Sequence, residues 1–365
     1  MSRVLLKAQV TFIDFVLKEW LVIASGAGFA LTSFYTKRLP VYSVNELQVL
    51  FILFVLFVTI KGLQRTGIIL KIARSIEKGK AIPFKLVLTT FFLSMLVTND
   101  IALIVIVPLT LSLSINRKDI LIILEALAAN SGSALIPIGN PQNLYIYWFY
   151  GVDLGTFIKT IAPFSLAFLG LLTVSSILVK VKIESQESNT QNINKKAYLY
   201  GVFFVVVLLT VFRVLPVAAG IVVIVFALAF DQKALRVDYG LLFSFLFFFG
   251  IADNLKTILT SEISHSGHIF IFSALASQIM SNVPATLLFA EFTSNWKALL
   301  WGSNAGGFGS LFGSLANLIA YKLYVTHEHI NNTSIFTAKF LLMGYISLFI
   351  SIGLYFLVYR PMALL

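Results

Sequence analysis

Long apolar stretches separated by short polar loops run along most of this chain. A helix that spans a bilayer needs about 20 consecutive apolar residues, and nine segments are apolar enough over about that length. They cover residues 18–37, 45–63, 120–147, 157–181, 197–214, 215–231, 239–256, 298–323 and 339–359. The pattern predicts an all-α integral membrane protein with about nine spanning helices.

Two further apolar segments, 84–113 and 268–292, carry polar residues in their middle. Residues 98–100 (Thr-Asn-Asp) interrupt the first segment, and residues 281–284 (Ser-Asn-Val-Pro) interrupt the second. Non-helical backbone at membrane depth is tolerated only where it is buried in protein or lines a wet cavity. Each segment is therefore expected to form a re-entrant hairpin with a polar tip. The alternatives are a solvated interfacial loop for the first and a proline-kinked span for the second.

Two of the nine expected spans are also interrupted. The span 120–147 contains Pro137 and Pro141, and because each removes a helix hydrogen bond, this helix must break. A break frees carbonyl groups that suit Na⁺ and creates a new helix N-terminus that suits an anion. The span 298–323 has several glycines but no proline. It is expected to be a looser break, or a small-residue face that packs against a neighbouring helix.

These interruptions occur in pairs, as if one half of the chain repeated the other. Paired interruptions in two hydrophobic halves point to a binding site near the membrane midplane of a secondary transporter. We therefore expect a first repeat over 1–182, a polar linker over 183–196 and a second repeat over 197–365. Three residues match at the tips and three at the broken spans: Ser94, Asn99 and Ala102 match Ser277, Asn282 and Ala285, and Asn130, Gly139 and Asn143 match Asn304, Gly313 and Asn317.

The basic residues predict the orientation, because cytoplasmic loops carry an excess of Lys and Arg. With a cytoplasmic N-terminus and an outside C-terminus, 20 of the 27 Lys and Arg residues fall on the inside. The hairpins then enter from opposite sides, which makes the repeats inverted, and the expected location is the cell inner membrane. The seven outside residues are Lys37, Arg38, Lys159, Arg213, Lys256, Lys297 and Arg360.

The composition agrees with a chain that faces lipid. Charged residues make up 12% and the mean hydropathy is +0.92, whereas soluble domains carry about 25% charge. The net charge of +11 does not indicate a nucleic-acid partner, because the basic residues are spread over short loops. The chain has no cysteine, which rules out thiolate metal sites. Neither a nucleotide-binding loop nor a hydrolytic triad is present, so we expect no enzyme activity, no cofactor and no metal centre.

Two carboxylates, Asp100 and Glu125, lie away from the ends of expected membrane segments, where an ionisable residue indicates a functional site. Asp100 is at the first tip, and its match at the second tip is Val283, so the two tips are not chemically equivalent. Glu125 lies five residues before Asn130. It is a candidate coupling residue, either as a protonation site or as a partner for a polar group on another helix.

The runs 98–103 (Thr-Asn-Asp-Ile-Ala-Leu), 130–144 (with Gly-Asn-Pro-Gln-Asn) and 281–285 (Ser-Asn-Val-Pro-Ala) resemble the ion transporter superfamily. The closest resemblance is to its branch of arsenite permeases, NhaD-type Na⁺/H⁺ antiporters and citrate or dicarboxylate transporters. The resemblance implies an inverted-repeat core with two hairpins and two unwound helices. It also implies a Na⁺ or H⁺ coupling site at each tip, and a homodimer that works by an elevator movement.

Carried over to this chain, the resemblance implies two ion sites. The first consists of Ser94, Thr98, Asn99, Gly139 and Asn140, and the second of Ser277, Ser281, Asn282 and Gly313. Asp100 at the first tip and the paired asparagines of the broken spans complete the candidate ion- and substrate-binding residues: Asn130, Asn143, Asn304 and Asn317. Dicarboxylate transporters of this branch carry Ser-Asn-Thr at both tips, from which both tips of this chain depart.

We therefore expect a secondary active transporter that moves a small anion, arsenite-, oxyanion- or carboxylate-type, coupled to Na⁺ or H⁺ by alternating access. One alternative is a Na⁺/H⁺ antiporter that uses Asp100. Another is the membrane subunit of an arsenite efflux pump, which would need an ATPase partner.

Overall fold

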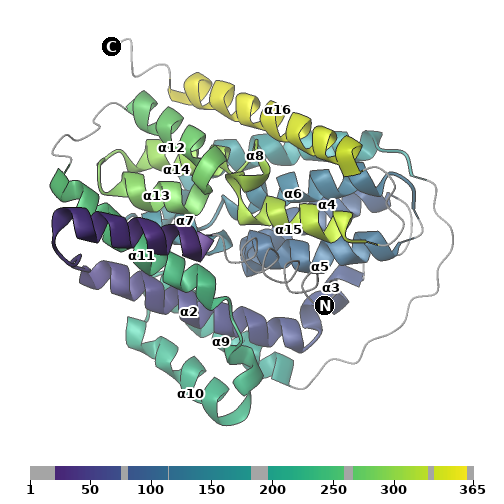
Figure 1. Cartoon of the computed structure of the whole chain (residues 1–365). Coiled ribbons are helices and arrows are strands. Elements are labelled where there is room, and N and C mark those ends of the chain that lie inside the picture. The colour runs from purple at the N-terminus through teal and green to yellow at the C-terminus, as the bar shows by residue number, and fades with distance from the viewer. Residues whose placement is uncertain are drawn as a thin grey trace, which may run out of the picture.

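The computed structural model describes residues 21–74, 81–113, 115–181, 196–258, 266–327 and 333–359. Apart from an isolated bridge residue at Ile115, the regular structure in these ranges is α-helix and short 3-10 helix, and the expected all-α class is confirmed. Figure 1 shows the helices packed side by side, with α16 along one edge and α9 and α10 at another.

The first half begins with the helix Leu21–Thr36. It continues with α2 Val44–Arg65, α3 Ile68–Arg74, α4 Ile82–Val97, α5 Asn99–Ser112, α6 Lys118–Ser133, η1 Pro137–Gly139, α7 Pro141–Phe149 and α8 Leu154–Leu178. The second half contains α9 Lys196–Val211, η2 Val217–Gly220, α10 Ile221–Phe230, η3 Gln232–Leu235, α11 Tyr239–Ile258, α12 Ser266–Met280, α13 Asn282–Ala290, α14 Trp296–Gly306, η4 Leu311–Gly313, α15 Leu315–Val325 and α16 Thr333–Tyr359.

Four described helices are long and apolar enough to cross a bilayer, namely α2, α8, α11 and α16. The helices at three other expected spans, Leu21–Thr36, Lys196–Val211 and Val217–Phe230, are apolar but shorter. The remaining two expected spans are each divided into two helices. The number and depth of membrane crossings thus stay predictions.

Several boundaries differ from those expected, for local reasons. The helix expected from 157 begins at Leu154, because the Asp153 carboxylate caps it by accepting from Thr156 N. The helix expected from 339 begins at Thr333, where the Phe336 ring packs on Tyr321 and Tyr324. The helix α9 begins at Lys196, the last residue of the expected linker 183–196, and the linker itself stays a prediction. Residues 182–195 lie outside the described residues.

Both halves have the same order of elements around their polar interruptions. A helix pair, α4 with α5 or α12 with α13, is followed by a broken helix, α6–η1–α7 or α14–η4–α15. Within each half the first arm of the pair packs on the first part of the broken helix, α4 on α6 and α12 on α14. Between the halves, α5 packs on α15 and α13 packs on α7, so the two halves interlock (Figure 1). The inversion of the repeats across a membrane stays a prediction.

Candidate functional site

Each helix pair turns at one polar residue whose backbone is strained. Thr98, between α4 and α5, has φ 79° and ψ 153°, and Ser281, between α12 and α13, has φ 75° and ψ 153°. This part of conformational space is essentially reserved for glycine, and a residue held there costs about 1–3 kcal/mol. The same strain thus occurs at both tips. In each case it ends one helix and begins the next, so the N-terminus of α5 or α13 lies directly at the tip.

The broken helices are interrupted in matching ways. In the first, the 3-10 turn Pro137–Gly139 leads into Asn140, which is extended at φ −154° and ψ 157°. In the second, the turn Leu311–Gly313 leads into Ser314, at φ −146° and ψ 144°. Of the two expectations for this span, the break has the same backbone form as the first rather than a looser one, and the expected small-residue packing is present where Gly306 meets Ser277. The helix α14 ends at Gly306, and the extended backbone of Ser314 precedes α15, so this break forms without proline.

Asparagine side chains join the two breaks and the first tip in one buried network. Asn99 Nδ2 donates to Asn130 Oδ1 at 3.2 Å, and Asn130 Nδ2 donates to Asn317 Oδ1 at 2.8 Å. Asn304 Nδ2 in turn donates to Asn143 Oδ1 at 2.8 Å. Asn130 and Asn304 are matched positions, as are Asn143 and Asn317. The two halves thus exchange the same hydrogen bond in both directions.

Further bonds connect this network to the freed backbone of each break. Asn140 Nδ2 reaches Asn304 Oδ1 at 3.2 Å, and Asn140 Oδ1 accepts from the backbone N–H of Asn143 at 3.0 Å, which caps α7. Asn143 Nδ2 donates to Ala134 O at 2.9 Å, and Asn317 Nδ2 donates to Gly307 O at 2.9 Å. The asparagines therefore satisfy carbonyl groups that the broken helices leave without a helical partner.

Glycines let the tip-bearing helices approach the broken helices closely. A Cβ at Gly132 of α6 would lie 2.2 Å from Phe91 O, and a Cβ at its match, Gly306 of α14, would lie 2.5 Å from the Ser277 side chain. Gly139 and Gly313 pack instead against their own chain, at 2.1 Å from Ser133 O and 2.7 Å from Gly306 O. All four positions exclude a larger residue.

The expected ion-site serines make local bonds. Ser94 Oγ donates to Phe91 O at 2.8 Å and Ser277 Oγ donates to Ser273 O at 2.6 Å. At the second tip, Ser281 Oγ donates to Asn282 Oδ1 at 3.4 Å. Among the described residues, no side-chain hydrogen bond joins these serines to Gly139, Asn140 or Gly313. The two ion sites implied by the resemblance thus stay predictions.

Two neighbouring pockets border the tips. The larger, about 180 Å³, is lined by Thr98 and Asp100 of the first tip region together with Lys61, Arg236 and residues of α2, α11 and α15. The smaller, about 60 Å³, is lined by Ser281 of the second tip. Both pockets share the wall residues Asp238, Leu241 and Leu315. One connected region of the molecule therefore borders both tips.

The Asp100 side chain lines the larger pocket and lies outside the asparagine network. Its backbone N–H donates to Asn99 Oδ1 at 3.0 Å. Its Oδ1 is buried and has no hydrogen-bond partner among the described residues. A buried acceptor of this kind is costly unless a cation or a donor reaches it. Glu125 is separate from this region, because its Oε1 accepts from Thr110 Oγ1 at 2.5 Å inside the packing of α5 on α6.

Several residues of the site were not expected from the sequence. Lys61, Arg236 and Asp238 enter the larger pocket from loops and helix ends far apart in the chain. Gln278 bridges α12 to the second break. A signal for Gln278 exists, since it directly follows the repeated Ser277. The three charged residues carry no such signal, because only the fold brings them to the tip.

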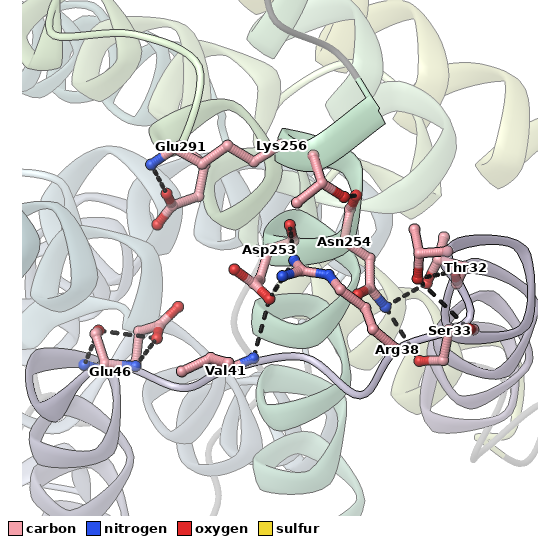
Figure 2. Close-up of polar contacts among 12 residues, drawn as sticks. Thr32, Ser33, Arg38, Val41, Glu46, Asp253, Asn254, Lys256 and Glu291 are labelled. Atoms are coloured by element: carbon pink, nitrogen blue, oxygen red, sulfur yellow. Dashed lines mark hydrogen bonds and ion pairs between the residues drawn. The ribbon is translucent and has the colours of Figure 1, made fainter.

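Away from the pockets, ion pairs join the last turns of α11 to the segment before α2 and to the end of α13. Arg38 Nη2 lies 2.7 Å from Asp253 Oδ2, which also accepts from the backbone N–H of Val41 at 2.9 Å. Lys256 Nζ lies 3.0 Å from Glu291 Oε2 at the end of α13. Figure 2 shows these pairs linking the segment before α2, the last turns of α11 and the end of α13. Ion pairs thus hold the segment before α2, the end of α11 and the end of α13 together. The pockets lie at the opposite ends of α2 and α11, near Lys61 and Asp238.

The sequence matches one family model and two known proteins. Residues 10–301 match the family model described as citrate transporter. An uncharacterized transporter of Methanocaldococcus jannaschii is 35% identical over 317 residues, which cover 84% of this chain and 87% of that protein. The inner membrane protein YbiR of Escherichia coli is 35% identical over 275 residues, which cover 69% of this chain and 72% of that protein. The resemblance to the ion transporter superfamily is thereby confirmed, and the chain belongs to the citrate transporter family of multi-pass membrane transporters.

Proposed function

We propose that this chain is a secondary active transporter that moves a small anion coupled to Na⁺ or H⁺ by alternating access. The observation that carries the proposal is the pair of strained tips, Thr98 and Ser281, each bordering one of two pockets with a common wall. Duplicated helix breaks around one region are the arrangement by which transporters bind a substrate and its coupling ion.

The chemistry of the region suits an anion together with a cation. The N-termini of α5 and α13 present backbone N–H groups and the positive ends of helix dipoles at the tips. Lys61 and Arg236 add positive charge to the larger pocket. Asp100 supplies a carboxylate for the cation. A carboxylate-type anion such as citrate is the first substrate to test, followed by arsenite-type and other oxyanions.

The position of the pockets favours an inward-facing arrangement. Lys61 and Arg236 belong to the predicted cytoplasmic side, whereas Arg38 and Lys256 belong to the predicted outside. In an inner membrane with a cytoplasmic N-terminus and an outside C-terminus, the pockets open inward while the ion pairs Arg38–Asp253 and Lys256–Glu291 close the outer end. Transport then requires these contacts to rearrange. We include a homodimer in the proposal because the family resemblance implies one.

A Na⁺/H⁺ antiporter is the second candidate function, and it is favoured by the buried Oδ1 of Asp100, which has no hydrogen-bond partner in the part of the chain that the structure describes. In an antiporter this carboxylate exchanges the two cations and no anion moves. A membrane subunit of an arsenite efflux pump is the third candidate. In that case transport depends on a separately encoded ATPase partner.

Flux measurements in everted vesicles from cells without their own antiporters separate these candidates. The pH gradient is followed after addition of Na⁺, with K⁺ as control, and then after addition of citrate or arsenite. Flux that needs the anion supports the proposal. Proton flux evoked by Na⁺ alone, and lost in Asp100→Asn, establishes the antiporter instead. Asp153→Asn is the matched control, because it makes the same chemical change at an exposed helix cap.

A further inference from the structure

A third cavity, of about 410 Å³, lies between α5 and the junction of α2 with α3. Its walls come from Gln64 of α2, from Ile69 and Leu70 of α3, and from a stretch of α5 between Ile104 and Ser112. Apart from Gln64 and Ser112 the lining is apolar. The α5 stretch covers about 12 Å of helix. Because a water molecule occupies about 30 Å³, the cavity is far larger than a water site and suits an elongated apolar ligand.

This cavity is open to the surroundings of the protein along α5. Ile104, Pro108 and Ser112 follow one another at intervals of four residues, on one face of the helix, and all three are exposed. On the other side α3 packs against both α2 and α5 (Figure 1). Its Ile69 is buried, whereas its Ile72 is exposed. Exposed apolar residues around an open apolar space indicate contact with lipid, so a lipid chain can enter along α5.

Positive charge lies at the Ser112 end of the cavity. Lys118 Nζ donates to the carbonyl of Leu111, the residue before Ser112, at 2.6 Å. The helix α6 begins at Lys118, so the positive end of its dipole is at the same place. Asp119, in the first turn of α6, is paired with Lys339 at 2.6 Å. An anionic group is therefore favoured next to Lys118.

The α2–α3 wall contributes a second cation and a hydrogen-bond acceptor. Lys71 directly follows Leu70 and is exposed. Gln64 Oε1 is buried and has no hydrogen-bond partner among the described residues. A buried acceptor is stabilised when a donor reaches it. This wall therefore suits a ligand that carries a hydroxyl group as well as a negative charge.

We propose that this cavity binds one anionic phospholipid of the phosphatidylglycerol type, with an acyl chain along α5 and the phosphate near Lys71 and Lys118. The glycerol hydroxyls of this headgroup can donate to Gln64 Oε1, whereas a choline headgroup has no O–H or N–H to donate. Both lysines belong to the predicted cytoplasmic side, where basic pockets between membrane helices bind anionic headgroups. The inference goes beyond the proposed function, because it does not depend on which substrate is moved.

The test is native mass spectrometry of the delipidated full-length chain, with phosphatidylglycerol or phosphatidylcholine of identical acyl chains added. One phosphatidylglycerol per chain is expected, bound about 25-fold more tightly than phosphatidylcholine, because each of two lysines near an anionic lipid contributes roughly a factor of five. Lys71→Gln and Lys118→Gln should each weaken phosphatidylglycerol binding about 5-fold. Lys180→Gln is the matched control, because Lys180 is exposed on the same predicted side but follows α8, which does not line the cavity.

Ser112→Trp distinguishes binding in the cavity from attraction to a charged surface. Ser112 is exposed, and its hydroxyl donates to Leu109 O of its own helix at 2.7 Å, so this variant should fold. The indole ring should fill the end of the cavity while both lysines remain. Phosphatidylglycerol binding should be lost. The lipid should also raise the unfolding temperature of the wild type, as a ligand of the folded state does, but not that of Ser112→Trp.

Equal binding of the two lipids would overturn the proposal, because any lipid chain would then fill the cavity. Phosphatidylglycerol binding that survives Ser112→Trp would overturn it too, since the lysines would then attract lipid at the surface only. Fluorescence-detected size exclusion confirms that each variant is folded. The outcome is independent of the flux measurements: a chain that binds phosphatidylglycerol but moves no anion keeps the lipid site and loses the anion assignment.

Discussion

The amide of Asn130 donates to the side-chain oxygen of Asn317 at 2.8 Å, across 187 residues of sequence. The matched residues make the reciprocal bond, from Asn304 to Asn143, over the same distance. All four side chains are buried. Each half therefore supplies a hydrogen-bond donor for a buried side-chain oxygen at the break of the other half.

Removing one amide of this exchange should destabilise the fold. Asn130→Ala leaves Asn317 Oδ1 and Asn99 Nδ2 without that partner, and a buried polar group left unpaired costs about 1–3 kcal/mol. A double-mutant cycle with Asn317→Ala should give a coupling energy of about 0.5–3 kcal/mol, and the cycle on Asn304 and Asn143 should give a similar value. Thermal unfolding in detergent measures each. Ser165→Ala is the control, because the buried Ser165 Oγ has no partner among the described residues and its loss should be nearly neutral.

The strain at the tips makes a second prediction. Thr98→Gly and Thr98→Ala both remove the hydroxyl, but only glycine relieves the backbone, which costs about 1–3 kcal/mol for other residues. Glycine also loses more conformational entropy on folding than alanine does, which destabilises the folded state by about 0.5–1 kcal/mol. Thr98→Gly should therefore be more stable than Thr98→Ala by about 0.5–2 kcal/mol, measured by thermal unfolding, and the same order should hold at Ser281. If the glycine and alanine variants unfold at the same temperature at both Thr98 and Ser281, the backbone at these positions is not strained.

Much of this arrangement follows from the sequence pattern, because hydrophobic length and polar interruption are local signals. The expected hairpin segments 84–113 and 268–292 correspond to the helix pairs 82–112 and 266–290. Pro141 marks the start of α7, where its missing N–H is no cost. The repeated asparagines identified the residues that meet at the breaks. What the pattern did not contain is which asparagine bonds to which.

The rest depends on contacts between distant parts of the chain. Lys61, Arg236 and Asp238 come together only because α2, α11 and α15 pack around the first tip. The backbone form of the second break was not predicted, because proline is the recognisable helix breaker, whereas the Gln278 bridge to Ser310 and Gly306 leaves no mark in the hydrophobic pattern. Helix ends were also misplaced where a cap or an aromatic contact extends the helix, as at Asp153 and Phe336.

The close approach of α4 to α6 should not tolerate a methyl group. Gly132→Ala would place its Cβ 2.2 Å from Phe91 O, so the two helices must separate. Overpacking of this kind costs about 1–3 kcal/mol and sometimes more. The yield of folded protein and its unfolding temperature should both fall. Gly170→Ala in α8 is the matched control, since no described atom beyond the local backbone of its own helix lies within 4 Å of the added Cβ, and helix propensity favours alanine there.

Acid should weaken the start of α8 through Asp153. Its pKa is lowered because the carboxylate accepts hydrogen bonds from the backbone N–H of Thr156 and from neighbouring groups. A lowered pKa in the folded state means that the stabilisation is present above the ordinary value and is lost as pH falls through the lowered one. Asp153→Asn keeps a cap that does not titrate. Its unfolding temperature should fall less than that of the wild type between neutral and acidic pH.

Glu125 is the other carboxylate expected within the membrane. Its Oε2, like Asp100 Oδ1, is buried without a hydrogen-bond partner among the described residues, but its distance from the two tip pockets predicts a structural role. Thr110 Oγ1 donates to its Oε1 at 2.5 Å, and the side chain is fully buried in the packing of α5 on α6, away from the residues that line the two tip pockets. Glu125→Gln conserves the volume and keeps an acceptor for Thr110, so cation-coupled flux per folded chain should be unchanged. Thr110→Val removes the donor and should destabilise the fold by about 1–3 kcal/mol. If Glu125→Gln folds as the wild type does but loses the cation dependence of flux, Glu125 is a coupling residue after all. The same flux assay on Asp100→Asn, where that dependence should disappear, provides the comparison.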